Sequence, residues 1–112
     1  MSQTMLTHEA LRSVLDELKH GLQALYGERL KGMYLFGSYA RDEAEPESDI
    51  DVLVVLDRID DYWVEIQRAS ELSARLSLDC GATIAKVFLC EQDWRSGDSP
   101  FLHNVSREAV AA

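Results

Sequence analysis

The chain has 112 residues, of which 46% are hydrophobic and 28% charged, and its formal net charge is −9. This length and composition fit one folded domain with one core, so we expect neither a disordered chain nor a second domain. The acidic balance repels DNA and RNA, so we do not expect a nucleic-acid partner. No apolar run approaches the roughly 20 residues that span a bilayer, so we expect no membrane contact and a cytoplasmic location.

The hydrophobic spacing and the turn residues predict an alternation of helices and strands. A first helix begins after Thr7 and ends at Gly27, with apolar residues every three or four positions on one face. The elements expected after it are a strand over Leu30–Phe36, a turn and short helix over Gly37–Asp42, a polar loop over Glu43–Glu47, a strand over Ser48–Leu56, a helix from Asp60 or Asp61, a strand over Ala82–Cys90, and a helix opened by Ser99 and Pro100. This order predicts a single α/β (α+β) domain over residues 1–112: a small mixed β-sheet with helices packed on one face.

Two carboxylates mark the second strand. Asp49 and Asp51 are two positions apart, and alternate residues of a strand project from the same face, which leaves Ile50 and Val52 to point into the core. Neighbouring carboxylates repel each other unless a cation lies between them, and hard oxygen ligands suit Mg²⁺ or Mn²⁺. The pair therefore predicts a metal site.

A glycine-serine turn comes at the end of the first strand. Gly37 lets the backbone approach a ligand, and the N–H groups that follow favour an anion. The Ser38 hydroxyl can donate to a phosphate oxygen, and Arg41, one helical turn further on, can reach the same anion. We expect these three residues and Ser48 to bind a nucleotide, and Ser38 to act in catalysis together with the two aspartates.

Each motif alone is commonly an ordinary turn or a solvated strand end, but their order and spacing are more specific. The sequence MYLFGSYARDEAEPESDIDVLVVL, residues 33–56, resembles the defining motif of the DNA polymerase beta superfamily, in its branch of stand-alone minimal nucleotidyltransferases. Gly37 and Ser38 match the family's Gly-Ser, Arg41 its arginine, and Asp49 and Asp51 its Asp-x-Asp. The resemblance implies a nucleotidyltransferase that uses ATP and Mg²⁺ or Mn²⁺.

A departure from the family concerns a third carboxylate, which active members usually carry on the neighbouring strand. The corresponding strand here reads ATIAKVFLC, residues 82–90, and has no acidic residue. Glu91 and Asp93 follow its end, so either of them, or no residue, supplies the third carboxylate. Lys86 is the one charged residue of this strand, and a position on a solvated face explains it more simply than a phosphate contact does.

The leading hypothesis is transfer of AMP from ATP to a hydroxyl of a partner that docks from outside. The resemblance implies a helical HEPN-domain protein as this partner, with the chain as the antitoxin of a toxin–antitoxin pair. An alternative is a catalytically weak or silent nucleotide-binding module that neutralises the helical partner by binding. Transfer to a small molecule is a third reading, and homo-oligomer formation stays open.

Overall fold

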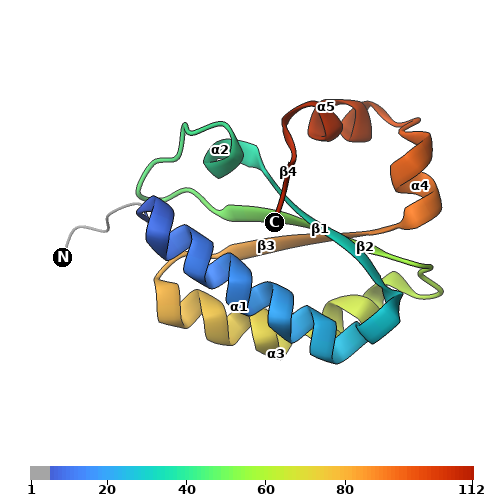
Figure 1. Ribbon diagram of the computed structural model, residues 1–112, viewed down its shortest axis with the longest axis horizontal. Coiled ribbons are helices and arrows are strands. Elements are labelled where there is room, and N and C mark those ends of the chain that lie inside the picture. The colour runs from blue at the N-terminus through green and yellow to red at the C-terminus, as the bar shows by residue number, and fades with distance from the viewer. Residues whose placement is uncertain (1–5) are drawn as a thin grey trace.

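The computed structural model describes residues 6–112, which form a four-stranded mixed sheet with helices on both sides (Figure 1). The strands are β1 Leu30–Phe36, β2 Ile50–Leu56, β3 Ile84–Cys90 and β4 Val110–Ala111. The helices are α1 His8–Tyr26, α2 Gly37–Ala40, α3 Tyr62–Cys80, α4 Glu91–Ser96 and α5 Pro100–Glu108, and the short 3₁₀ turn η1 covers Gly27–Arg29. The sheet order is β3-β2-β1-β4, with β2 and β3 parallel and the other pairs antiparallel. The predicted fold class is confirmed.

The helix ends follow from local capping. The Thr7 hydroxyl accepts a hydrogen bond from the Ala10 N–H at 3.0 Å, and the Asp61 carboxylate accepts one from the Trp63 N–H at 3.0 Å. Both side chains satisfy an N–H group that the first turn of a helix leaves without a partner. Gly27 and Gly81 end α1 and α3 with positive φ angles. The predicted start and end of α1 and the predicted start of α3 are confirmed to within two residues.

The main core lies between the sheet and the pair α1 and α3, which lie together on one face in Figure 1. The central strand β2 is fully buried from Val52 to Leu56, as its unbroken apolar run predicts. Side chains from α1 and α3 that fill this core include Leu18, Leu22 and Leu76, each at most 1% exposed. The β2 strand is thereby held rigidly, which also holds the residue at its start.

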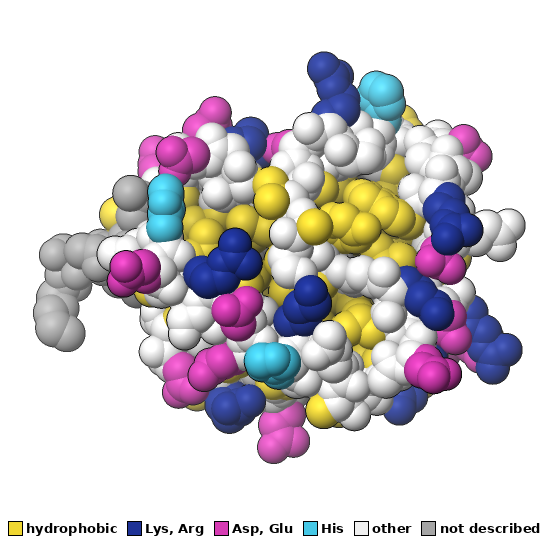
Figure 2. All heavy atoms as spheres, viewed as in Figure 1, with side chains coloured by type: hydrophobic (Ala, Val, Ile, Leu, Met, Phe, Trp, Pro, Cys, Tyr) yellow, Lys and Arg dark blue, Asp and Glu magenta, His cyan; other side chains and the backbone are white. Residues whose placement is uncertain are grey.

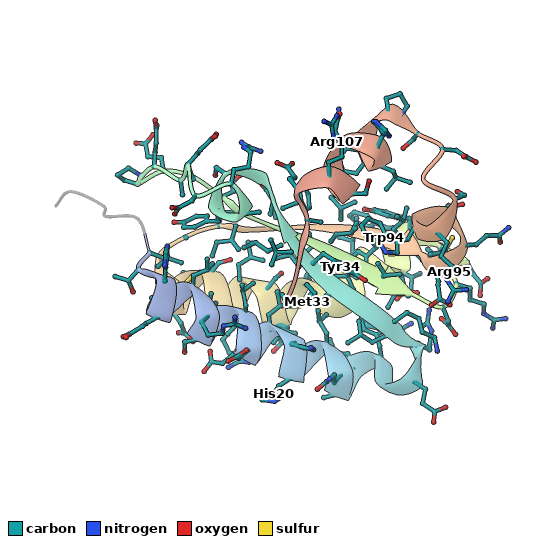
Figure 3. All side chains as sticks on the ribbon, turned by 45° about the horizontal axis from the view of Figure 1, so that its top comes forward. His20, Met33, Tyr34, Trp94, Arg95 and Arg107 are labelled. Carbon is teal, nitrogen blue, oxygen red and sulfur yellow. The ribbon has the colours of Figure 1, made fainter. Side chains whose placement is uncertain are left out.

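A smaller apolar cluster lies on the other face, under α4 and α5. Leu53 and Val55 of β2 pack there against Val105 of α5. Figure 3 shows Tyr34 of β1 beside Trp94 of α4, with ring centroids 4.8 Å apart. The two long helices thus cover one face of the sheet, as expected, and the short helices α4 and α5 form a second layer on the other face.

A charged cluster joins η1, the turn that precedes β1, to α3. The Glu65 carboxylate is buried and accepts hydrogen bonds from Arg29 at 3.1 Å and from Arg68 at 3.2 Å. Burial alone would raise the pKa of Glu65, but the hydrogen bond and charge of Arg29 outweigh it, and the pKa lies below its usual value. Burial and the nearby Glu65 charge raise the pKa of Tyr26 to about 12. This cluster keeps a buried carboxylate ionised and fully paired.

Three features differ from the prediction. Residues 91–96, for which no helix was predicted, form α4, and the two-residue strand β4 was not predicted, because two residues carry no readable alternation. Lys86 is not on a solvated face: it is half-buried, and its ammonium group donates to the Ser73 hydroxyl at 2.6 Å. Burial lowers the pKa of Lys86. Within residues 6–112, no helix has the length and apolarity that crossing a membrane requires.

Candidate functional site

The structure brings the glycine-serine turn and the aspartates together at one end of the sheet. Gly37 is the first residue of α2 and directly follows β1, where Phe36 pairs with Asp51 of β2. Ile50 and Val52 are fully buried, as predicted, so Asp51 projects from the opposite face. Asp49 lies immediately before β2 and is exposed. The antiparallel pairing of two consecutive strands therefore places both motifs side by side.

Gly37 packs directly against Asp51. It has φ +75°, and a Cβ built at this position would lie 2.9 Å from Cγ and 3.1 Å from Cβ of Asp51. Real Cβ atoms essentially never come this close, and the positive φ disfavours any other residue. We expected a Cβ here to block an approaching phosphate; the structure adds that it would first displace the Asp51 carboxylate.

The two aspartates form an acidic, partly desolvated site. Burial raises the pKa of Asp51, and the negative charge of Asp49 raises it further, whereas the Arg41 charge lowers it. A divalent cation would relieve both effects, and two carboxylates are the hard oxygen donors that Mg²⁺ and Mn²⁺ prefer. Within residues 6–112, no three His, Cys, Asp or Glu side chains lie close enough together to hold a metal by themselves. The remaining ligands would have to come from water and phosphate oxygens.

Arg41 lies beside this site with its charge already engaged. Its guanidinium donates to Glu108 at 2.7 Å and to Glu43 at 3.2 Å. Glu108, at the end of α5, was not foreseen from the sequence, because nothing in its neighbourhood forms a motif. Its negative charge also contributes to the raised pKa of Asp51. The site therefore has a further acidic residue that comes from the last helix.

Ser38 and Ser48 occupy different local settings. Ser38 is half-buried in the first turn of α2, and its carbonyl accepts a hydrogen bond from the Glu43 N–H at 2.9 Å. The Ser48 hydroxyl accepts one from the Glu45 N–H at 2.8 Å, which shapes the loop between α2 and β2. Ser48 thus has a structural role in that loop, while its nucleotide contact stays a prediction.

The β3 strand offers no carboxylate next to Asp51. The parallel register pairs Asp51 with Ala85, so a methyl group stands at the neighbouring position. Glu91 and Asp93 belong to α4, past the other end of β3. Ala85 and Glu91 are six positions apart, and at about 3.3 Å per residue this corresponds to roughly 20 Å. The geometry is therefore wrong for either residue to serve as a third carboxylate of this chain's site.

Hollows elsewhere on the surface do not coincide with these residues. Four of them have volumes of about 230, 290, 300 and 330 Å³, and none of the four is lined by Gly37, Ser38, Asp49 or Asp51. In the face shown in Figure 2, hydrophobic side chains gather near the centre and charged ones of both signs surround them. His20 points away from the sheet in Figure 3, in accord with a surface residue.

Comparison with known proteins identifies the family of the chain. Residues 15–78 match the family model of the nucleotidyltransferase domain, a range that includes the Gly-Ser turn and both aspartates. The protein adenylyltransferase MntA of Thermococcus cleftensis is 39% identical over 74 residues, which cover 66% of this chain and 73% of that protein. A relative from Methanocaldococcus jannaschii, also named as a protein adenylyltransferase, is 36% identical over 78 residues, or 70% of this chain and 72% of the relative.

Solved structures show the same fold. A minimal nucleotidyltransferase is similar with a TM-score of 0.60 and 24% identity, and covers 94% of this chain and 95% of its own. A toxin–antitoxin structure with AMP-PNP is similar with a TM-score of 0.57 and 21% identity, over 95% of this chain and 72% of that one. The chain belongs to the nucleotidyltransferase-domain family.

Proposed function

We propose that the chain is a metal-dependent adenylyltransferase that moves AMP from ATP to a hydroxyl group of a partner protein. The partner would be a helical HEPN-type protein, with this chain as the antitoxin of the pair, acting in the cytoplasm. Two relatives carry the name protein adenylyltransferase, and two similar structures are toxin–antitoxin complexes, which supports this choice. The acceptor would dock from outside.

The packing of Gly37 on Asp51 carries the proposal. Gly37, in the turn that would bind the triphosphate, contacts Asp51, which would bind the cation. The groups that would bind the phosphates and the metal are therefore already positioned next to each other. A glycine with positive φ at this contact has no evident role in the core, because the contact is made to a half-buried carboxylate. A nucleotide site explains why the chain keeps this arrangement.

Each residue would have a separate task. Asp49 and Asp51 would hold Mg²⁺ or Mn²⁺, and the cation would supply charge neutralisation at the α-phosphate and the leaving pyrophosphate. Gly37 lets the backbone reach the phosphates, Ser38 donates its hydroxyl to a phosphate oxygen, and Arg41 adds a fixed positive charge. Ser48 keeps the preceding loop folded, next to Asp49. These residues position the nucleotide, and the partner supplies the attacking hydroxyl.

One observation favours a second candidate, a nucleotide-binding module with little or no turnover that neutralises its partner by binding. Ala85 stands opposite Asp51, where a third carboxylate on β3 would be, and Glu91 and Asp93 lie at the other end of that strand. General-base catalysis typically contributes a factor of about 10² to 10⁴. Without such a base, transfer would be slow unless the partner orders its own hydroxyl.

The two candidates are separated by isotope transfer. The chain is co-expressed with a candidate helical HEPN-type partner, and the purified pair is incubated with Mg²⁺ and ATP labelled at the α-phosphate. Label on the partner, with a mass increase of one AMP, supports the adenylyltransferase. Tight ATP binding without label on either protein supports the binding module.

A further inference from the structure

Glu108 lies beside the site because two elements fix it there. It is the last residue of α5, and two residues later Val110 pairs with Leu35 of β1, next to the Gly37 turn. Leu102 and Val105 of the same helix are buried, and Val105 packs in the smaller apolar cluster with Leu53 and Val55 of β2. The position of Glu108 is therefore set by packing and strand pairing and not by its ion pair alone.

The environment of Glu108 differs from that of the other acidic partner of Arg41. The Glu108 side chain is 25% exposed and lies 2.7 Å from the guanidinium, whereas Glu43 is 67% exposed and lies 3.2 Å from it. The charge of Glu108 also reaches the Asp51 carboxylate, since it contributes to the raised pKa of that group. Glu43 is thus a surface partner, and Glu108 is a partner within the site.

We propose that Glu108 is a positioning residue of the nucleotidyltransferase site, and that its charge, acting through Arg41, makes polyphosphate binding depend on a divalent cation. The proposal rests on the proposed function. The charges of Asp49, Glu108 and Arg41 all act on the Asp51 carboxylate, so three carboxylates stand against one guanidinium at this site, and an anion that arrives without a cation meets net negative charge. The same negative charge attracts a divalent cation.

Glu108 thereby supplies the acidic charge that β3 lacks at Ala85. It does so from the opposite side of Gly37, because β4 pairs with β1 on the edge away from β2. The Arg41 guanidinium has five N–H groups and donates one to Glu108 and a second to Glu43, so further donors stay available to a phosphate. When a metal–nucleotide complex enters, Arg41 is already in place.

The test compares Glu108→Gln with the matched control Glu43→Gln, since both changes remove one carboxylate bonded to Arg41. Calorimetry measures the affinity for inorganic tripolyphosphate in EDTA and in Mg²⁺, and the affinity for Mn²⁺ alone. In Glu108→Gln, metal-free tripolyphosphate should bind about two- to fivefold more tightly and Mn²⁺ about two- to fivefold more weakly, the effect expected of a partly exposed ion pair. Glu43→Gln should change each constant less than twofold.

Further variants distinguish charge from folding. Glu108→Asp keeps the charge and should restore the parental dependence on metal, and Arg41→Gln should remove most of the gain that Glu108→Gln gives in metal-free binding. Opposite shifts for the anion and the cation would not arise from a general loss of structure. Equal effects of the Glu108 and Glu43 changes, or weaker binding of both tripolyphosphate and Mn²⁺ in Glu108→Gln, would overturn the proposal.

The proposed function fails separately from this inference. If the parent binds Mg²⁺–ATP and Glu108→Gln alters none of the three constants, only the role of Glu108 is wrong. If the parent binds neither Mg²⁺–ATP nor tripolyphosphate nor Mn²⁺, both the nucleotide site and the role of Glu108 are wrong.

Discussion

Replacing Gly37 by alanine tests the contact between the turn and Asp51, and Gly81→Ala is its matched control. Both glycines have nearly the same φ, +75° and +77°, so the cost of placing a Cβ on a left-handed backbone, about 1–2 kcal/mol, is common to both. At Gly81 the added Cβ meets nothing within 4 Å, whereas at Gly37 it meets Asp51. Overpacking of this kind typically adds about 1–3 kcal/mol.

The expected loss in unfolding free energy is therefore about 2–5 kcal/mol for Gly37→Ala and about 1–2 kcal/mol for Gly81→Ala. Urea denaturation followed by circular dichroism measures both values, and calorimetry measures Mg²⁺–ATP affinity of each folded variant. Gly37→Ala should lose nucleotide binding because Asp51 is displaced, while Gly81→Ala should bind as the parent does. Equal stability and equal ATP affinity of the two variants would show that the Gly37–Asp51 contact has no role in binding.

Three further outcomes are expected. Asp49→Asn with Asp51→Asn should abolish the gain in ATP affinity that Mg²⁺ gives, and equal gains in variant and parent by calorimetry would argue against a metal site here. Glu91→Gln with Asp93→Asn should leave Mg²⁺–ATP binding unchanged, since both residues lie at the other end of β3; a large loss would place them in the site. Glu65→Gln should cost about 1–3 kcal/mol near neutral pH. Because the folded-state pKa of Glu65 is depressed, its stabilisation is complete above the usual value of 4.5 and is lost as the pH falls below it, so the variant and the parent should converge in acid. A constant difference in urea midpoint between pH 7 and pH 3 would contradict this.

Most of the fold could be predicted because local signals and packing agree. Thr7 and Gly27 bound an amphipathic helix whose apolar face enters the core, and the apolar run of β2 is buried on both sides. The Ser99–Pro100 pair opens α5, with the Ser99 hydroxyl accepting a hydrogen bond from the Leu102 N–H at 3.0 Å. Strand β4 escaped prediction because its two residues form a strand only through pairing with β1.

The residues of the candidate site were likewise predictable only in part. Gly37 directly follows β1 and Asp51 lies in β2, the next strand, which pairs with β1, so the contact between them follows from a short motif. Glu108 reaches Arg41 only through the path of α5 and β4, and a contact of this range leaves no pattern in a single sequence. The position of Lys86 was misjudged for a related reason, because the Ser73 hydroxyl that receives its ammonium group comes from α3.

We propose that Asp49 and Asp51 support AMP transfer to a partner protein. The most direct test is the mass spectrum of the helical partner after incubation with this chain, ATP and Mg²⁺, beside the same reaction with Asp49→Asn and Asp51→Asn. The partner should gain one or more AMP groups with the parent chain and none with the double variant. A partner modified equally by both chains, or modified without a divalent cation, would contradict it.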